Sequence, residues 1–275
     1  MTRERTFLFS VDLEDPRLLV PNGERYRPRV EPMTLRYLDW LDRHRFSATF
    51  FVVGVVARRY PDLVREIARR GHELACHSDR HVQLDRQSPD AFRADVAECL
   101  ATLARLGAGA VVGYRAPTFS LTARTAWAYD VLGALGVRYS SSVLPAANPI
   151  YGWAEFGAAT RRVPPGVLEI PMTVGRIGPL RVPLAGGVYF RVLPFTLLAR
   201  AIDRVPPGAP VTGYLHPYDI DEDQERFMHA GIHGNRFYHW LMFVNRGSVF
   251  RRLDRMVARG HRIETYASYA AQFPG

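Results

Sequence analysis

The chain has 275 residues, of which 47% are hydrophobic and 23% are charged. This composition is typical of a globular protein and excludes collagen-like, low-complexity and intrinsically disordered chains. The net charge is +9, from 36 Lys and Arg against 27 Asp and Glu residues, and every one of these cations is an arginine. The arginines are scattered along the sequence, so the charge excess by itself indicates no nucleic-acid partner.

Strands and helices are predicted to alternate along most of the chain. Short apolar runs predict buried strands, and leucines at helical spacing or Pro and Gly at segment ends predict helices. The predicted strands are 6–12, 47–54, 72–77, 110–115, a short one near Tyr139, 168–172, 211–216 and 261–264. The predicted helices are 34–44, 61–70, 89–106, 122–135, 194–205 and 249–259, and residues 142–166 have no regular pattern. This order predicts an α/β fold with a parallel sheet, and seven or so strands in one domain of residues 1–275 favour a barrel.

Neither a membrane span nor a cysteine framework is expected. The longest stretch without a charged residue, 139–154, is too short to cross a bilayer and contains two prolines. The only cysteines, Cys76 and Cys99, form no CxxC pair, so neither a disulfide framework nor a cysteine zinc site is indicated. The first predicted strand begins by Thr6, without the pattern of an export signal, so a cytoplasmic location is expected. The oligomeric state stays open.

Polar residues follow four of the predicted strands. The first strand ends in Asp12, Glu14 and Asp15, and the others are followed by His77 with His81, by Arg115 and by His216. Taken singly, each has an ordinary structural explanation, such as a turn former, a solvated histidine or a salt bridge. In a parallel barrel, however, the carboxyl ends of the strands meet at one rim. Carboxylates, imidazoles and a guanidinium brought together there indicate an active site.

The order and spacing of these motifs resemble the polysaccharide deacetylases, the NodB-homology or family-four carbohydrate esterases. The resemblance spans roughly residues 6–265, and part of it is similar to a branch found in bacterial exopolysaccharide loci. The matching motifs are SVDLED from Ser10, HSDRH from His77, YRAPTFS from Tyr114, EIP from Glu169 and LHP from Leu215. Membership implies a distorted (β/α)7 barrel, a divalent metal and hydrolysis of N-acetyl groups on an N-acetylated sugar or glycan.

The resemblance also implies roles for individual residues. Asp12 would be the base, His216 the acid, and Arg115 would orient Asp12. The metal ligands would be His77, His81 and a carboxylate from the first motif, where Leu13 stands in place of the second aspartate usual in the family. Because side chains alternate along a strand, Glu14 shares a face with Asp12, and Asp15 is kept in reserve. One carboxylate and two imidazoles suit Zn²⁺, while Co²⁺, Ni²⁺ or Fe²⁺ stay possible.

Substrate contacts are assigned more loosely than the catalytic groups. The expected substrate-binding residues are Pro117, Phe119, Tyr189 and Arg191, although core packing is as good an explanation for each aromatic side chain. Two alternatives to a sugar deacetylase stay open at this point. One is a hydrolase of a cyclic amide or ureide, similar to allantoinase-like enzymes. The other is a catalytically silent barrel that only binds carbohydrate.

Overall fold

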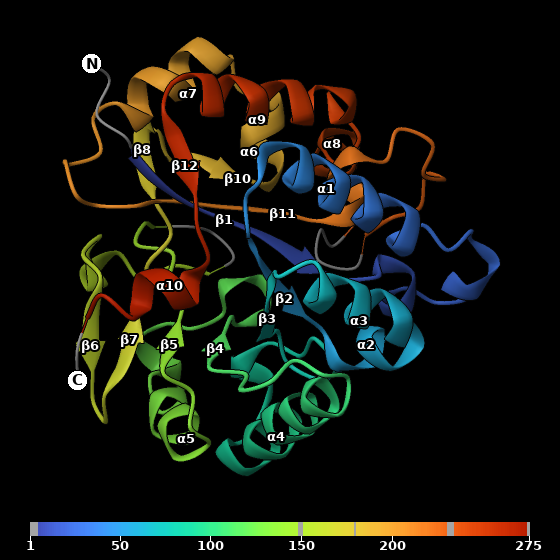
Figure 1. Ribbon diagram of the computed structural model, residues 1–275, viewed down its shortest axis with the longest axis vertical. Helices are drawn as coiled ribbons and strands as arrows, with labels where there is room; N and C mark the ends of the chain where they lie inside the picture. The colour runs from blue at the N-terminus through green and yellow to red at the C-terminus, as the bar shows by residue number, and fades with distance from the viewer. Residues whose placement is uncertain (1–4, 148–150, 179, 230–233, 274–275) are drawn as a thin grey trace.

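A computed structural model describes residues 5–147, 151–178, 180–229 and 234–273. Strands and helices alternate through most of this part of the chain (Figure 1). The strands are β1 (Arg5–Leu13), β2 (Thr49–Val52), β3 (Glu73–Cys76), β4 (Gly113–Tyr114), β5 (Tyr139–Ser140), β6 (Arg161–Val163), β7 (Val167–Glu169), β8 (Val174–Ile177), β9 (Leu180–Pro183), β10 (Ala185–Gly186), β11 (Val211–Leu215) and β12 (His261–Ile263). The helices are α1 (Val30–His44), α2 (Gly54–Arg59), α3 (Pro61–Arg69), α4 (Pro89–Arg105), α5 (Ala128–Ala134), α6 (Gly187–Val192), α7 (Phe195–Ile202), α8 (Arg236–Leu241), α9 (Val249–Ala258) and α10 (Tyr266–Ala270).

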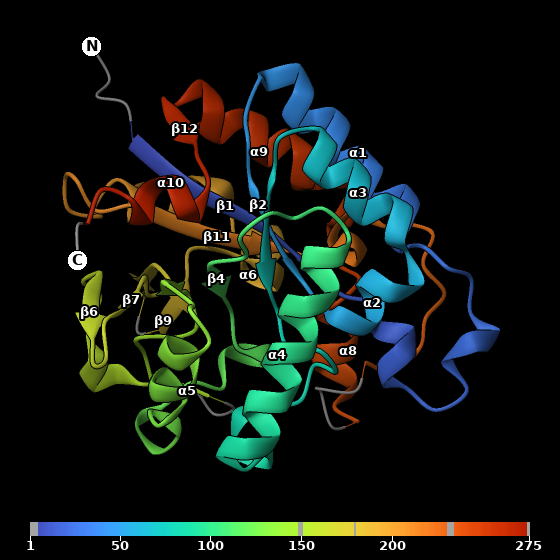
Figure 2. The ribbon, with the colours of Figure 1, turned by 60° about the horizontal axis from the view of Figure 1, so that its bottom comes forward.

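The main sheet is a curled parallel sheet with helices around its outside. Its strand order is β10-β11-β1-β2-β3-β4-β5-β7-β6, and β12 pairs with the first residues of β1. Every pair in this sheet is parallel except β6 with β7. In both ribbon views β1 and β11 lie side by side at the centre (Figures 1 and 2). The sequence therefore predicted the α/β class and the parallel sheet correctly.

The curled sheet closes into a distorted barrel through a side-chain contact. Thr173 follows β7 and Thr212 lies on β11, and the two residues exchange hydrogen bonds between backbone N–H groups and hydroxyls at 2.5 and 2.8 Å. No backbone ladder between β7 and β11 is found within the described residues. The seven parallel strands β1, β2, β3, β4, β5, β7 and β11 thus surround a common interior, as the (β/α)7 expectation requires.

The first strand shows why its sequence is apolar on both faces. Phe9 and Val11 point outward into the core shared with the helices, whereas Leu8 points into the barrel interior. Both faces are buried, which produces a continuous hydrophobic run instead of an alternating one. The inward positions continue with Ser10 and Asp12, which are also buried. The same alternation that builds the core therefore directs the polar end of β1 into the barrel.

Several elements differ from the sequence prediction. The stretch predicted to be irregular contains β6, whose Arg161 and Arg162 are exposed on the edge of the sheet. An edge strand has one neighbour and little apolar alternation, so its pattern is weak. The segment predicted as one helix over 122–135 is a 3-10 turn followed by α5, and β4 covers only two residues. The β8–β9 hairpin and the short helices α2, α6 and α8 were not predicted at all.

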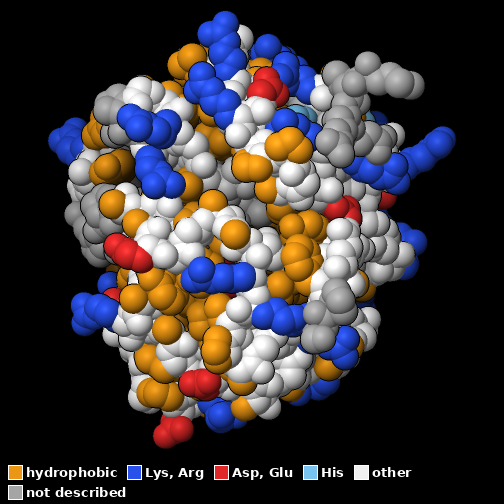
Figure 3. Space-filling view, turned by 90° about the vertical axis from the view of Figure 1, so that its left-hand side faces the viewer, with side chains coloured by type: hydrophobic (Ala, Val, Ile, Leu, Met, Phe, Trp, Pro, Cys, Tyr) orange, Lys and Arg blue, Asp and Glu red, His pale blue; other side chains and the backbone are white. Residues whose placement is uncertain are grey.

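The surface carries dispersed basic side chains. On the face drawn in Figure 3, arginines lie scattered among hydrophobic and uncharged groups, and few acidic groups are seen there. Such a distribution differs from the dense basic stripe of a nucleic-acid-binding face. Among the described residues, no helix combines the length and the apolar character that crossing a bilayer requires.

Candidate active site

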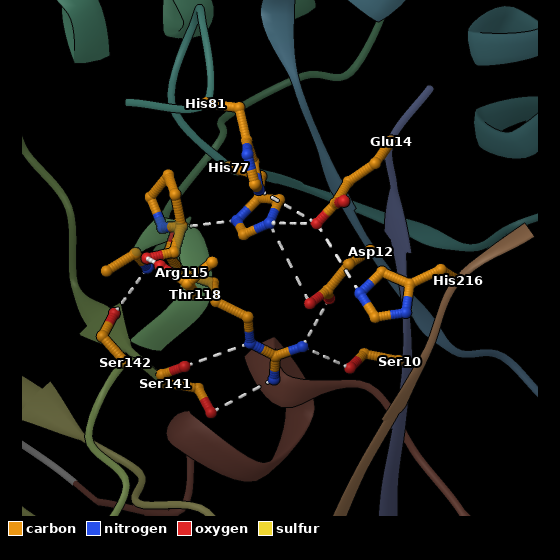
Figure 4. A network of polar contacts seen from close by, with 12 residues as sticks. Ser10, Asp12, Glu14, His77, His81, Arg115, Thr118, Ser141, Ser142 and His216 are labelled. Atoms are coloured by element: carbon orange, nitrogen blue, oxygen red, sulfur yellow. Dashed lines mark hydrogen bonds and ion pairs between the residues drawn. The ribbon is translucent and has the colours of Figure 1, made fainter. Parts of the chain in front are cut away.

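Four parallel strands deliver polar side chains to one rim of the barrel. Glu14 directly follows β1, His77 follows β3, Arg115 follows β4 and His216 follows β11. Figure 4 shows these side chains turned toward one another, with Asp12 between Arg115 and His77. The structure therefore brings together the groups that the sequence assigned to catalysis and metal binding.

The two acidic residues at the end of β1 point in different directions. Glu14 continues the inward alternation of Asp12 and faces the histidines. Asp15 accepts hydrogen bonds from the backbone N–H and side chain of Arg17, with Nη2 2.5 Å from its Oδ2, and caps the 3-10 helix Pro16–Leu19. Because its carboxylate is already paired and turned away, the geometry favours Glu14 over Asp15 as a metal ligand.

Glu14 lies at the centre of three imidazoles. Its Oε1 is 3.2 Å from Nε2 of His77, 3.0 Å from Nε2 of His81 and 3.6 Å from Nε2 of His216. Burial opposes ionisation of Glu14, but the charges of His81 and His216 hold its pKa well below the ordinary value. Burial likewise opposes protonation of His81, and the neighbouring Glu14 carboxylate raises the pKa of this imidazole. The cluster is therefore a strongly coupled buried group of charges.

Glu14, His77 and His81 fit a divalent metal ion. Their ligand atoms lie within 4.8 Å of one another, and ligands about 2.1 Å from a tetrahedral ion stand roughly 3.4 Å apart. Nδ1 of His77 lies 2.9 Å from the carbonyl of Arg115, a contact that places the proton on Nδ1 and leaves Nε2 free to coordinate. Nε2 of His81 is buried and makes no hydrogen bond despite its closeness to Glu14. A buried nitrogen without a hydrogen bond is available to coordinate a metal ion.

Asp12 is held by a fully buried guanidinium. Nη1 of Arg115 donates to Oδ1 of Asp12 at 2.6 Å and to the hydroxyl of Ser10 at 2.6 Å. The remaining donors of Arg115 bond to Ser141 and to the hydroxyl of Tyr266. The guanidinium carbon also lies 3.9 Å from the centre of the Phe51 ring, within the range of a cation–π contact. Arg115 is therefore fixed on every side, and it orients one carboxylate oxygen of Asp12.

His216 is oriented by a carboxylate from its own strand end. Oδ2 of Asp219 lies 2.8 Å from Nδ1 of His216 and accepts the His216 backbone N–H at 2.9 Å. Oδ1 of Asp219 accepts from Nε of Arg191 at 2.9 Å. Burial opposes the charged imidazole, yet Glu14 and Asp219 together raise the pKa of His216 to about 9. A pKa this high keeps His216 protonated near neutral pH.

Left-handed backbone conformations cluster around the site. Ser78 and His81 in the loop after β3 have φ of 67° and 58°, and Thr118 and Phe119 in the loop after β4 have φ of 53° and 56°. Such conformations are uncommon outside glycine and persist where surrounding contacts impose them. In the first loop, the hydroxyl of Ser78 accepts the backbone N–H of His81 at 3.0 Å, which turns the second histidine back toward Glu14.

A cavity of about 370 Å³ opens beside the cluster. Of the residues expected to bind substrate, Phe119 and Tyr189 line it, whereas Pro117 and Arg191 do not. Pro117 is buried at the start of the short 3-10 turn Pro117–Phe119 that follows β4. The expectation for Arg191 is corrected by its surroundings. It is fully buried on α6 and donates to Asp219 and to the carbonyls of Leu241 and Val244, so it supports the site from behind.

Three further cavity residues were not identified from the sequence. Tyr218 stacks on the His216 ring at a centroid distance of 4.5 Å, and Tyr214 meets the same ring edge-on. Burial lowers the pKa of His229, on the far side of Tyr218, to about 4, so this imidazole is neutral. The position of Tyr218 inside the His-Pro-Tyr-Asp segment was a usable signal. His229 lies in a loop without any pattern, so only the structure places it here.

Comparison with known proteins agrees with this geometry. A sequence profile of the polysaccharide deacetylases matches residues 25–139, and a profile of a domain of unknown function (DUF3473) matches residues 141–269. A chitooligosaccharide deacetylase of Bradyrhizobium sp. (strain ANU 289) is 44% identical over 52 residues, which are 19% of this chain and 24% of that protein. A Bacillus cereus peptidoglycan-N-acetylglucosamine deacetylase is 33% identical over 84 residues, 30% of each chain. The matched stretches therefore span less than a third of these relatives.

Solved structures support the same fold. A Mycobacterium smegmatis protein assigned to the polysaccharide deacetylases superposes with a TM-score of 0.65 over 99% of this chain and 91% of its own, at 18% identity. At this identity the likeness shows the fold alone, and it confirms the distorted barrel. The first profile includes His77, His81 and Arg115, whereas His216 and Asp219 fall within the second. The profile match over residues 25–139, the relatives and the fold together support membership of the polysaccharide deacetylase family.

Proposed function

We propose that this protein is a metal-dependent hydrolase that removes acetyl groups from an N-acetylated aminosugar or glycan, with release of acetate and a free amine. One observation carries the proposal. The Glu14, His77 and His81 cluster lies between a carboxylate fixed by a guanidinium and an imidazole fixed by a carboxylate. The relatives named as deacetylases of chitooligosaccharide and of peptidoglycan N-acetylglucosamine support this substrate class.

Glu14, His77 and His81 would hold the divalent ion, and this ligand set suits Zn²⁺ and also accepts Co²⁺, Ni²⁺ or Fe²⁺. A bound ion of this kind supplies a Lewis acid for the acetyl carbonyl and lowers the pKa of water. Binding it would also displace the protons that Glu14 shares with the imidazoles, because a ligating histidine must be neutral. Zn²⁺ is our proposal among these metals.

Proton transfer falls to the two groups on either side of the cluster. Asp12, paired with and oriented by Arg115, would take the proton of the attacking water. His216, protonated and oriented by Asp219, would give a proton to the departing sugar nitrogen. An amine is a poor leaving group as an anion, so protonation of the nitrogen is required for the C–N bond to break. Phe119 and Tyr189 would contact the sugar in the adjoining cavity.

The test is acetate release from N-acetylated chitooligosaccharides by the Zn²⁺-loaded protein. Asp12→Asn and His216→Ala should each keep the metal and lower turnover about 10²- to 10⁴-fold, the usual range for losing a positioned proton-transfer group. His81→Ala should lower metal occupancy as well. Asp62→Asn, at an exposed carboxylate on α3, is the matched control and should behave as wild type. Full activity of Asp12→Asn, or ring opening of a cyclic ureide without acetate release, would contradict the proposal.

A cytoplasmic location is a separate proposal. It would limit the enzyme to soluble or lipid-linked precursors, because finished wall polymer lies outside the cell membrane. Fractionation of cells that produce the protein tests it, since recovery outside the cytoplasmic membrane would contradict it.

A further inference from the structure

Large exposed hydrophobic side chains gather at the mouth of the active-site cavity. Within the described part of the chain, seven such residues are exposed, and six of them lie in three segments that border the cavity. These six, named here the mouth patch, are Leu18, Leu19, Met228, Phe237, Tyr238 and Trp240. Leu19 and Tyr238 line the cavity themselves, and Met228 precedes the cavity residue His229. The seventh, Leu197, lies on α7, which contributes no residue to the cavity lining.

The aromatic part of the mouth patch stands on the short helix α8. Phe237 is 62% exposed, Tyr238 51% and Trp240 53%, while Leu241 of the same helix turns into the cavity. The helix is fixed at both ends: Asn235 caps its first turn, and Arg191 donates to the carbonyl of Leu241. Because the helix is fixed, these three aromatic rings stay exposed to water, and their exposed area adds nothing to the stability of the fold. Contiguous exposure of this kind marks an interaction surface.

Apolar surface continues from the rim into the protein. A second cavity, of about 320 Å³, is lined by Leu18, Leu19, Val53, Val55 and Val56 and by the charged residues Asp15 and Arg80. Glu14 and His81 also line it, so it adjoins the same cluster as the first cavity. The five aliphatic side chains among these nine lining residues suit a hydrocarbon chain. The aliphatic side of this cavity favours a lipid as the occupant of the rim.

The residue types of the mouth patch are those of a membrane-interface surface. Trp and Tyr prefer the boundary between headgroups and hydrocarbon, and Leu, Phe and Met insert next to them. Arg80 and Arg236 are exposed beside the patch and make no ion pair within the described residues. The chain as a whole carries +9, which attracts anionic headgroups. The acidic residues Glu24 and Asp223 lie in neighbouring segments and weaken the attraction to anionic headgroups. Insertion of apolar side chains would therefore contribute more to bilayer binding than charge attraction does.

We propose that the mouth patch docks on an anionic lipid bilayer, so that the cavity opens toward the headgroups and receives an N-acetylated sugar linked to a lipid. The substrate part of this inference rests on the proposed deacetylase function, whereas binding to a bilayer does not. The lipid chain would leave the membrane along Leu18 and Leu19, and the sugar would reach the Glu14, His77 and His81 cluster.

The experiment measures co-sedimentation of the purified full chain with vesicles of phosphatidylcholine alone and with vesicles containing one third phosphatidylglycerol. We expect binding to the anionic vesicles, and a loss of about tenfold or more for Phe237→Ser combined with Trp240→Ser, because two half-exposed aromatic rings no longer insert. Leu197→Ser is the matched control on α7 and should bind as wild type. Trp240 emission should shift to the blue on binding, and Trp240→Phe should remove the shift while keeping the binding.

Each result decides between occupants. Absence of binding to anionic vesicles, or an equal loss in the Leu197→Ser control, would overturn the proposal. Concentration-dependent dimerisation that the Phe237→Ser and Trp240→Ser pair abolishes, without vesicle binding, would assign the patch to a second copy of the chain instead. Acetate release from a soluble chitooligosaccharide separates this inference from the proposed function. The double variant should retain that activity, and a wild type that binds vesicles but releases no acetate would refute only the deacetylase.

Discussion

Replacement of Arg115 by Met should strongly destabilise the protein, because it leaves a charge unpaired inside the barrel. Arg115 is fully buried, and its guanidinium donates to Asp12, Ser10, Ser141 and Tyr266. Removing one partner of a buried ion pair costs about 3–5 kcal/mol, since the carboxylate left behind keeps its desolvation penalty. We therefore expect a decrease of about 3–5 kcal/mol in the free energy of unfolding.

A second substitution distinguishes loss of the pair from loss of packing. Asp12→Asn removes the charge that Arg115→Met leaves unpaired, so the double variant should be no less stable than Arg115→Met alone. If the single effects are about 3–5 and 1.5–3 kcal/mol, this result corresponds to a coupling of at least about 1.5–3 kcal/mol, the whole effect of Asp12→Asn. Urea unfolding of the four proteins in EDTA measures it through the midpoints at constant m-value. Additive effects of the two substitutions would refute the reasoning, because they would show that the charges do not stabilise each other.

The remaining predictions concern the metal ligand and pH dependence. Glu14→Gln should lower Zn²⁺ affinity at least tenfold, measured by competition with a chelator, whereas Asp15→Asn should lower stability and leave the affinity close to wild type. Asp219→Asn removes an anion that favours protonated His216, so the alkaline limit of activity should move to lower pH by about one unit; an unchanged pH–rate profile would contradict this role. Burial lowers the pKa of His72 to about 4, while the unfolded imidazole titrates near 6.5. The unfolded chain therefore binds the extra proton, and stability should fall by up to about 3 kcal/mol from pH 6.5 to 4. Thermal or urea unfolding across this range should show a smaller decrease in His72→Leu, and an identical decrease would exclude His72 as its source.

The sequence predicted the parts of the fold that depend on local pattern. β1, α4 and β11 have uninterrupted apolar runs or clear helix boundaries, and their bounds agree with the prediction within about two residues. Elements with a weak local pattern were missed. β6 is polar because it lies on a sheet edge, and α8 is exposed along most of its length. Neither has the buried face that produces a periodic sequence.

The sequence predicted those site residues whose side-chain direction follows from their position at the end of a strand. Alternation along β1 was enough to place Glu14 beside Asp12, and the structure shows the two carboxylates facing the same interior. The sequence did not show which polar residues bind substrate and which only hold the site in place, because this depends on contacts between distant segments. Arg191, expected at the substrate, is 28 residues from Asp219 in the chain and binds it from behind, inside the protein. No pattern in the sequence around Arg191 encodes that partner.

The sequence by itself thus determined the barrel class, the order of the motifs and the residue types that could bind a metal and transfer protons. Only the tertiary structure decided that Asp15 is bound by Arg17, that Arg191 binds Asp219, and that six exposed hydrophobic residues lie in three segments bordering one cavity. The physical reason is that hydrophobic periodicity shows which face of a helix or strand is buried, and this periodicity depends only on residues close together in the sequence. Hydrogen bonds and surface patches of this kind form between segments far apart in the chain, which come close to one another only in the folded barrel.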